Sequence, residues 1–463
     1  MPLIRSISGV RATLGDACTP DIVAAYVMAY SAVMPEGAIV VGRDGRPSGK
    51  WMESVVLGAL AACGRPARSA GMVPTPTVQL LTEKSDAVGG IIITASHNPA
   101  PWNGLKFLAS DGTFLDADAN ARLWNALDTR SFSCSSEQQS APVTVIDDAI
   151  DQHINAVLAL PLFSSDALQR IRARALRVVV DAVNCSGSRA VPQLLRALGV
   201  EVIELYCTGS GEFPHTPEPL TEHLGDLCHA VREHRADAGF AVDPDADRLV
   251  IIDHRGQAIG EERTVMLAIE AVMRNALLFS GSSDEGASPD TPPVAVVNMS
   301  TSRMAMDAAL RYNGRCELAP VGEINVVRAM QRTKACVGGE GSGGVIVPAC
   351  HYGRDSLVGC ALTIWLMAHT TEAEWSTLTT EQKYCMLKTK FTVAERPSSF
   401  NVKLDAHEAE QTRISYDDGV RVDWEDSWVQ LRASNTEPIV RIIAEAATRT
   451  QAEALIARAQ EWV

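Results

Sequence analysis

Three parts of the chain repeat one order of strand, turn, helix and strand, and this repeat limits the possible folds more than any other feature. Each part begins with a short apolar run, as a buried strand requires. These runs are residues 38–41, 176–180 and 294–297. Apolar residues then recur at helical spacing. Strands that alternate with helices form α/β sheets, so the pattern predicts three related α/β units.

The C-terminal part of the chain has a different pattern. Residues 420–424 and 427–431 alternate like antiparallel strands, with a turn between them. A third strand, 439–443, precedes a helix near Thr450, and Thr450-x-x-Glu453 has the form of a capping box. This part is therefore predicted to be a separate α+β domain.

Length, charge and cysteine content exclude several classes of protein. A chain of 463 residues should hold several domains. Its net charge of −15 argues against a nucleic-acid binder, and an anionic substrate would need a locally basic pocket. No apolar run is long enough to span a membrane, and the start lacks the apolar region of a secretory signal. The eleven cysteines are scattered, without a Cys-x-x-Cys pair. They fit reduced, buried thiols in the cytoplasm better than a disulfide framework or a zinc site.

The first chemical motif follows an apolar run at residues 90–93, which predicts a buried strand. The next six residues, 94–99, read Thr-Ala-Ser-His-Asn-Pro. A polar cluster closed by proline places the last side chains at a surface turn. Ser96 is then expected to be an exposed hydroxyl on a rigid element, which suits a nucleophile or group carrier. Ser-His-Asn-Pro alone would also fit an ordinary turn.

The second motif, residues 243–248, reads Asp-Pro-Asp-Ala-Asp-Arg between two apolar runs. Carboxylates at Asp243, Asp245 and Asp247 can converge on one cation, and oxygen ligands suit Mg²⁺. A calcium-binding EF-hand is excluded, because Arg248 and His254 occupy the positions of its glycine and glutamate. The alternative to a metal site is a solvated acidic turn.

Two further motifs carry groups that bind sugars or phosphates. The glycine-rich segment 338–344 contains Glu340, whose carboxylate can accept hydrogen bonds from sugar hydroxyls. Residues 432–438 read Arg-Ala-Ser-Asn-Thr-Glu-Pro, and Arg441 follows. Two arginines, hydroxyls, an amide and backbone N–H groups make a plausible phosphate cradle. The alternative for segment 338–344 is a simple glycine turn. The alternative for residues 432–438 is a β-turn with a solvated arginine.

In this order, the four motifs resemble the phosphoserine, metal-binding, sugar-specificity and phosphate-binding loops of the α-D-phosphohexomutases. Shorter matches occur at residues 8–11, 42–46, 101–106 and 321–323. The chain departs from the family at Ala12, where glycine is usual, and at Gly344, where many members have histidine. The second departure leaves the sugar open, and His351 is either a replacement for that histidine or a structural residue.

The resemblance implies an α/β fold of three related α/β domains with mixed sheets, plus a C-terminal α+β domain, arranged around a central cleft. The predicted domains are residues 1–158 (phosphoserine), 159–260 (metal binding), 261–370 (sugar recognition) and 371–463 (phosphate binding). It also implies reversible 1,6-phosphoryl transfer on a hexose phosphate. Phosphorylated Ser96 would donate its phosphoryl group to the sugar, giving a 1,6-bisphosphate that turns around and returns its other phosphoryl group.

The resemblance carries over a set of site residues and cofactors. The implied catalytic residues are Ser96, His97, Lys106 and Arg11, with Arg11 and Lys106 as candidates for proton transfer. The latter role needs a lowered lysine pKa. The implied metal ligands are Asp243, Asp245, Asp247 and a phosphoryl oxygen on Ser96. The implied substrate-binding residues are Arg248, Glu340, Ser342, Arg432, Ser434, Asn435, Thr436 and Arg441. Further site candidates are Arg43, Asn98, Glu323 and His351. One Mg²⁺ per chain and a glucose or hexosamine 1,6-bisphosphate are the expected cofactors.

The start of the chain and its Gly-Gly-Glu-Gly-Ser-Gly-Gly segment look like the phosphoglucosamine mutase branch, which predicts glucosamine phosphate as substrate. A phosphomannomutase or phosphoglucomutase is the second interpretation. A metal-dependent phosphatase that uses Ser96 and a non-catalytic sugar-phosphate-binding protein are the remaining ones. The expected partners are small sugar phosphates, with no nucleic acid or membrane, and the expected state is a monomer or homodimer.

Overall fold

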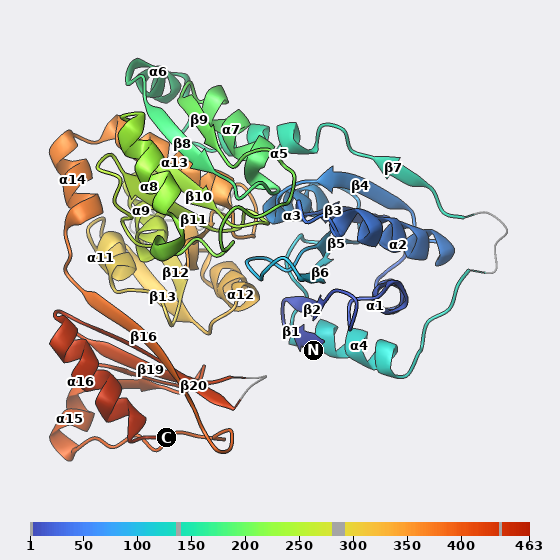
Figure 1. Cartoon of the computed structure of the whole chain (residues 1–463). Coiled ribbons are helices and arrows are strands. Elements are labelled where there is room, and N and C mark those ends of the chain that lie inside the picture. The colour runs from blue at the N-terminus through green and yellow to red at the C-terminus, as the bar shows by residue number, and fades with distance from the viewer. Residues whose placement is uncertain (1–2, 136–139, 280–291, 435–437) are drawn as a thin grey trace.

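Four β-sheets organise the chain in the computed structural model, which describes residues 3–135, 140–279, 292–434 and 438–463 (Figure 1). Asn435 and Thr436 of the predicted phosphate loop lie outside the described residues. Each sheet forms one domain together with the helices that pack beside it.

The first domain has a seven-stranded sheet in the order β1-β2-β6-β5-β3-β4-β7. Its strands are β1 (Ile4–Ser6), β2 (Gly9–Thr13), β3 (Ile39–Arg43), β4 (Ala67–Met72), β5 (Gly89–Ile93), β6 (Trp102–Ala109) and β7 (Val143–Val145). Its helices are α1 (Pro20–Val33), α2 (Gly49–Ala62), α3 (Thr75–Glu83), α4 (Ala117–Asp128) and α5 (Ala149–Leu158).

The second and third domains have four-stranded sheets in the orders β11-β10-β8-β9 and β13-β12-β14-β15. The second domain contains α6 (Ser165–Ala173), β8 (Arg177–Asp181), α7 (Gly187–Ala197), β9 (Glu201–Leu205), the 3-10 helix η1 (Thr221–His223), α8 (Gly225–Glu233), β10 (Ala238–Val242) and β11 (Leu249–Asp253). The third contains α9 (Glu262–Met273), α10 (Ala276–Phe279), β12 (Val294–Asn298), α11 (Met304–Leu310), β13 (Arg315–Ala319), α12 (Glu323–Thr333), β14 (Val337–Glu340), β15 (Gly344–Ile346) and α13 (Ser356–His369).

The repeat that the sequence predicts is present in the strand pairing. In each of the three sheets a central strand (β3, β8 or β12) pairs in parallel with a strand on either side. A fourth strand (β6, β11 or β15) then pairs antiparallel with the third strand of the unit. The central strands β8 and β12 are almost wholly buried, which explains their uninterrupted apolar sequences.

The antiparallel hairpin of each unit carries one of the predicted motifs. The serine motif joins β5 to β6, the aspartate motif joins β10 to β11, and the Glu340 motif joins β14 to β15. In each loop one residue has a left-handed backbone, namely Ser96 (φ 51°), Ala246 (φ 52°) and Gly343 (φ 91°). The same supersecondary position therefore supplies the chemistry in all three domains.

The fourth domain is an antiparallel sheet in the order β16-β20-β19-β18-β17, with helices beside it (Figure 1). Its elements are β16 (Cys385–Thr392), α15 (Ala406–Gln411), β17 (Arg413–Ser415), β18 (Val420–Asp423), β19 (Trp428–Ala433), β20 (Ile439–Ala446) and α16 (Arg449–Gln460). Helix α14 (Glu372–Thr380) leads into it from the third domain. Together the four sheets confirm the predicted fold class, while the domain boundaries given above stay predictions.

The first three domains share a hydrophobic cluster, whereas the fourth has its own. The shared cluster includes Val40, Val180 and Val297 from the three central strands. The cluster of the fourth domain includes Leu431 and Trp462. Polar contacts connect the fourth domain to the third, such as the hydrogen bond from Ser300 Oγ to Gln430 Oε1 at 2.8 Å.

Three smaller expectations are also decided by the structure. The capping box of α16 is formed by Thr448 and Gln451, so the predicted box at Thr450 and Glu453 is wrong by two positions. Thr448 has the extended backbone that an N-cap needs, and Thr450 lies inside the first turn. All eleven cysteines are described and carry free thiols, as expected, but only four of them are buried. Within the described ranges, no helix has the length and apolar character needed to cross a membrane.

Candidate active site

Ser96 lies at the centre of a buried polar cluster where the first and second domains meet. Its side-chain hydroxyl donates a hydrogen bond to Asp243 Oδ2 at 3.1 Å. The residue is 1% exposed, so the expectation of an exposed hydroxyl is wrong. The aspartate loop of the second domain covers the serine, a contact that the local sequence could not reveal.

A buried arginine, Arg46, fixes the backbone of the serine loop. Its Nε donates to Asp44 Oδ2 at 3.0 Å. Its remaining N–H groups donate to the backbone carbonyls of Ser96, Asn98, Pro99 and Trp102. All five donors of the guanidinium are thus used. Sequence reasoning singled out Arg43 from this motif and missed Arg46, although both arginines stand in the segment 42–46.

The three aspartates of the second motif converge as predicted. Asp243, Asp245 and Asp247 are fully buried, and one oxygen from each lies within 4.8 Å of the others. Thr75 at the start of α3 holds the loop by donating from its hydroxyl to Asp245 Oδ2 at 2.7 Å. Ser356 at the start of α13 donates to the carbonyl of Ala246 at 2.6 Å.

This aspartate cluster fits a hard divalent cation. Among the described residues, Asp245 Oδ1 and Asp247 Oδ1 have no hydrogen-bond partner. Buried carboxylate oxygens without a donor are costly unless a cation binds them. The ligand set consists of oxygens only, which is the set that Mg²⁺ prefers.

Lys106, on β6, reaches the same carboxylates. Its Nζ lies 2.6 Å from Asp245 Oδ2 and 3.3 Å from Asp247 Oδ2. Burial by itself lowers the pKa of Lys106, but the charges of Asp245 and Asp247 outweigh it and raise that pKa above its ordinary value. The lowered lysine pKa that proton transfer needs is therefore not found, because anionic neighbours dominate over cationic ones.

The other residues predicted beside Ser96 are close to it. Nδ1 of His97 lies 3.3 Å from the Ser96 hydroxyl, and Arg11 donates to Asn98 Oδ1 at 3.0 Å. Burial, together with the charges of Arg248 and Arg11, lowers the pKa of His97 to about 2. His97 is therefore neutral at physiological pH.

Arg354 connects the third domain to the aspartates and was not singled out from the sequence. Its guanidinium donates to Asp247 Oδ2 at 2.6 Å, to Glu340 Oε2 at 2.7 Å and to Glu323 Oε2 at 3.0 Å. Each predicted carboxylate of the third domain is thus tied to the metal loop through one arginine. Burial raises the pKa of Glu323 to about 7, whereas Arg354 outweighs burial at Glu340 and lowers its pKa.

The departure at Gly344 has a structural counterpart in this arginine. A Cβ at Gly344 would lie 2.3 Å from Cδ of Arg354. The space that a side chain at 344 would enter is therefore filled by Arg354. Ser342, in the same loop, is partly exposed.

Two further candidates do not join this cluster. His351 is buried elsewhere, with Nε2 3.1 Å from Asp355 Oδ2. Arg43 points along α2, where its Nε donates to Glu53 Oε2 at 2.8 Å.

Three basic residues of the fourth domain form a row across its sheet. Lys390 on β16 pairs in register with Arg441 on β20, and Arg441 pairs with Arg432 on β19. Arg432 Nε also lies 2.8 Å from Asp418 Oδ2, and Ser434 is buried at the end of the strand. Like charges opposite one another destabilise a sheet unless an anion binds them. The row therefore fits a phosphate, and Lys390 is a member that sequence reasoning missed.

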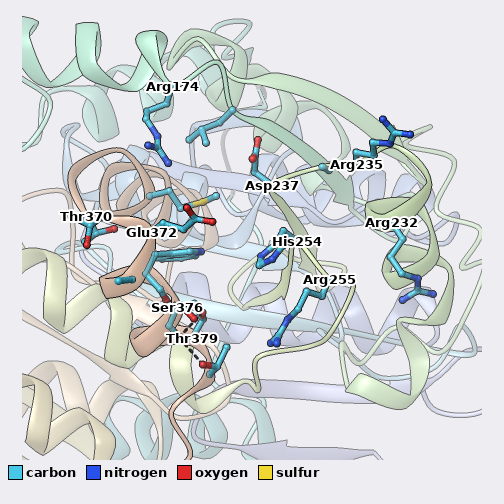
Figure 2. Close-up of a pocket in the computed structure, with 17 residues that line it drawn as sticks. Arg174, Arg232, Arg235, Asp237, His254, Arg255, Thr370, Glu372, Ser376 and Thr379 are labelled. Carbon is cyan, nitrogen blue, oxygen red and sulfur yellow. Dashed lines mark hydrogen bonds between the residues drawn. The ribbon is translucent and has the colours of Figure 1, made fainter.

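A cavity of about 1280 Å³ lies between the second domain and α14, apart from these residues (Figure 2). Arg174, Arg235 and Arg255 line it, together with Glu372 of α14. It contains no residue of the serine, aspartate or Glu340 loops. The candidate active site is therefore the buried polar cluster around Ser96, and not this cavity.

Comparison with known proteins also finds four domains in this chain. Four family models match in order: phosphoglucomutase/phosphomannomutase alpha/beta/alpha domain I at residues 4–133, domain II at 151–256, domain III at 265–384, and the C-terminal domain at 384–461.

Individual proteins match over nearly their full length. A phosphoglucomutase/phosphomannomutase of Thermococcus kodakarensis is 32% identical over 96% of this chain and 94% of its own. A phosphoglucosamine/phosphogalactosamine mutase of Sulfurisphaera tokodaii is 28% identical, over 97% and 96%. The crystal structure of a phosphoglucomutase/phosphomannomutase family protein from Burkholderia thailandensis superposes with a TM-score of 0.80 at 24% identity, over 99% and 97%. With its serine, aspartate and Glu340 loops on three repeats of one fold, this chain belongs to the phosphoglucomutase/phosphomannomutase family.

Proposed function

We propose that this mutase moves a phosphoryl group between O1 and O6 of a hexose phosphate through phosphorylated Ser96, with glucosamine 6-phosphate as its main substrate. The observation that carries the proposal is the 3.1 Å contact between the Ser96 hydroxyl and Asp243, inside a cluster of three buried aspartates. A hydroxyl on a fixed loop beside a cation site is what a phosphoryl carrier needs.

The reaction consists of two transfers in opposite directions. In the first, the bond between Ser96 Oγ and phosphorus breaks, and the oxygen of a free sugar hydroxyl forms the new bond to phosphorus. The sugar hydroxyl loses its proton in this step, and Ser96 Oγ takes one up. The product, a hexose 1,6-bisphosphate, turns around in the site. Its other phosphoryl group then returns to Ser96 Oγ, which restores the phosphorylated enzyme and releases the isomer.

One Mg²⁺ would be held by Asp243, Asp245 and Asp247, and when bound it supplies positive charge beside the transferring phosphoryl group. Lys106 lies 2.6 and 3.3 Å from two of these carboxylates and would contribute positive charge beside them. Arg11 remains the candidate for proton transfer at the sugar hydroxyl. The neutral ring of His97, with Nδ1 3.3 Å from Ser96 Oγ, is close enough to hydrogen-bond the serine hydroxyl when the phosphate is absent.

The third and fourth domains would bind the two ends of the substrate. The row Arg432–Arg441–Lys390 would hold the phosphate that does not react, because charge-assisted bonds to phosphate are strong. Glu340 and Ser342 would face the sugar ring. Arg354 fixes the orientation of the Glu340 carboxylate before the sugar arrives.

The identity of the sugar rests on the resemblance to phosphoglucosamine mutases and on the Sulfurisphaera tokodaii relative. The Thermococcus kodakarensis relative supports the second candidate, a phosphomannomutase/phosphoglucomutase. A location in the cytoplasm and a monomeric or homodimeric state stay predictions.

A side-by-side assay tests the proposal. Purified enzyme with Mg²⁺ and a catalytic amount of hexose 1,6-bisphosphate is given glucosamine, glucose and mannose 6-phosphates. We expect the highest kcat/KM for glucosamine 6-phosphate and loss of activity in Ser96→Ala. Faster turnover of glucose or mannose phosphate would select the second candidate. Release of inorganic phosphate without isomerisation would contradict the mutase mechanism and indicate a phosphatase.

Variants of the two binding loops test whether one loop binds the phosphate and the other recognises the sugar. Arg432→Ala should weaken all three substrates by a similar factor, by about 1.5–3 kcal/mol for a lost charged hydrogen bond. Glu340→Gln should change the ratio between the sugars instead. The matched control is Arg449→Gln, at an exposed arginine of the same domain that pairs with Glu453. It should change neither the binding of the three substrates nor the ratio between them. If Arg432→Ala altered the sugar preference and Glu340→Gln did not, the two assignments would be wrong.

A further inference from the structure

A second cluster of metal-ligating side chains is buried between the first and third domains. It contains His153 on α5, Cys350 and His351 in the loop after β15, and Asp355, the N-cap of α13. The four residues are at most 2% exposed. One ligand atom from each lies within 4.8 Å of all the others. None of these residues has a role in the phosphoryl transfer proposed above.

Two groups of this cluster lack a partner. Nε2 of His351 lies 3.1 Å from the acceptor Asp355 Oδ2, so Nε2 carries the ring proton and Nδ1 holds a lone pair. Among the described residues, nothing donates to that Nδ1. The Cys350 thiol likewise makes no hydrogen bond within the described ranges. Because either ring nitrogen of a neutral histidine can carry the proton, Nε2 of His351, which faces Asp355, is a potential metal ligand once the proton moves to Nδ1, and so is the buried sulfur of Cys350.

The candidate ligands are held by further hydrogen bonds, as the ligands of protein metal sites usually are. Nδ1 of His153 lies 2.8 Å from the Thr77 hydroxyl on α3. The second oxygen of Asp355 accepts the backbone N–H groups of Leu357 and Val358, at 2.7 and 3.3 Å. Such outer hydrogen bonds fix the ring and carboxylate of metal ligands in a single orientation.

We propose that His153, Cys350, His351 and Asp355 bind one Zn²⁺ ion. Two nitrogens, one sulfur and one oxygen are a tetrahedral zinc set, whereas Mg²⁺ requires oxygen ligands. Bond lengths of about 2.0–2.3 Å place such donors roughly 3.3–3.6 Å apart. Nε2 of His153 and Nε2 of His351 lie 2.8 and 3.1 Å from Asp355 Oδ2. Small outward shifts of these atoms would therefore give them the spacing of zinc ligands.

The protons balance when the metal binds. Cys350 releases its thiol proton to solvent and binds as the thiolate. Each histidine stays neutral and keeps one proton on the ring nitrogen that does not bind the metal. On His153 that nitrogen is Nδ1, which then donates to Thr77. Asp355 binds as the carboxylate and exchanges its two histidine hydrogen bonds for the metal bond.

The ion would join parts of the chain that build the active site. Helix α5 belongs to the first domain and packs against α13 of the third (Figure 1). Arg354, which orients Glu340 and Asp247, directly precedes Asp355. Ser356, which holds the aspartate loop, directly follows it. The role of the zinc is therefore structural, because it fixes the segment that carries both residues.

Metal analysis tests this site. The full-length chain is produced with added Zn²⁺, purified without chelator, and its zinc is measured per chain. We expect about one zinc in the wild type and in Asp245→Asn, which alters only the magnesium cluster. Cys350→Ala and His153→Ala should hold at least tenfold less. Cys360→Ala, which removes a buried thiol from α13, is the matched control and should keep its zinc.

Cobalt substitution gives a readout that does not depend on a variant folding. Co²⁺ in the wild-type site should show a thiolate-to-cobalt charge-transfer band and the intense visible bands of a tetrahedral ion. Absence of both bands, together with less than about one tenth of a zinc per chain after loading, would overturn the proposal. Zinc retained in full by a folded Cys350→Ala, or zinc lost only in Asp245→Asn, would overturn it as well.

Discussion

Arg46 is the residue on which the shape of the serine loop depends most. It is 1% exposed and donates to four backbone carbonyls of residues 96–102. Only the planar fork of an arginine can reach so many acceptors at once, because a lysine ammonium has three donors. The neighbouring carboxylate, Asp44, balances its charge at 3.0 Å.

We therefore expect Arg46→Lys to lower both stability and turnover. At least two buried carbonyls lose their donor, at about 1–3 kcal/mol each. Displacement of Ser96 should lower kcat by roughly 10²-fold. Chemical unfolding and steady-state kinetics measure the two effects.

The matched control is Arg65→Lys in the same domain. Arg65 also holds backbone carbonyls, those of Ser31 and Met34, but far from the serine loop. It should lose comparable stability and keep its kcat. Equal losses of kcat in both variants would show that Arg46 acts through general stability alone.

His215 gives the second domain a dependence on pH. Its Nε2 lies 2.9 Å from Asp181 Oδ2, and its Nδ1 lies 2.8 Å from the carbonyl of Thr216. Both partners are acceptors, so the charged ring with two N–H groups fits this place. Burial by itself lowers the pKa of His215, but Asp181 outweighs it and raises that pKa above 6.5.

Because the folded-state pKa is the higher one, His215 stabilises the fold fully below about pH 6.5 and loses this effect as the pH rises through the raised pKa. We expect the stability difference between wild type and His215→Gln to shrink by about 1 kcal/mol between pH 6 and 9. Urea unfolding at several pH values measures it. A stability difference between wild type and His215→Gln that grew with pH would refute the assignment.

At the scale of elements, one hairpin is used three times. The serine, aspartate and Glu340 loops follow the third strand of their units, at the edge where the parallel strands end. Ligands of α/β sheets bind at this edge. The repeated unit thus places Ser96, the aspartate cluster and Glu340 at matching positions, and Lys106 and Arg354 connect them.

Helix α16 shows how two overlapping local signals can compete for the start of one helix. Thr448 caps the helix and Gln451 completes the box, whereas Glu453 pairs with Arg449 at 2.9 Å. Thr448→Ala should therefore destabilise the fourth domain by about 1 kcal/mol. Thr450→Ala, the control two positions later, should change the unfolding free energy by less than about 0.5 kcal/mol. If urea titrations showed a larger loss of stability for Thr450→Ala than for Thr448→Ala, the cap predicted from the sequence would be correct.

At the scale of the whole molecule, the fourth domain has a hydrophobic cluster of its own. The other three domains share one cluster, in addition to a separate cluster in each of them. Polar contacts such as Ser300–Gln430 and Lys388–Glu262 join the two parts. Domains joined mainly by polar contacts unfold more independently than domains that share a core.

We expect two transitions in scanning calorimetry. Trp462→Ala, in the cluster of the fourth domain, should destabilise one transition by about 3–5 kcal/mol. Leu194→Ala, a fully buried residue of the shared cluster, should shift the other transition and leave the first in place. A single transition that both variants shift equally would show that the four domains unfold as one unit.

The sequence by itself determined the order of the elements and the chemistry of the loops. Apolar runs such as 176–180 and 294–297 became central strands, because continuous burial leaves little choice of residue type. The three aspartates were found because ligands on one short loop stay close in any fold. The free thiols and the four-domain architecture were predicted correctly from composition and pattern.

The tertiary structure alone decided which distant residues meet. Ser96 is buried because a loop 147 positions away covers it, and Lys106 lies 2.6 Å from Asp245 of the same loop. His153 and Asp355 are 202 positions apart yet in contact, so no spacing rule for zinc ligands could detect their cluster. Arg46 and Arg354 were not singled out from the sequence, since the role of an arginine depends on the acceptors that the folded chain brings around it. Local patterns record burial and backbone geometry, whereas charge, pKa and ligand sets depend on contacts between domains.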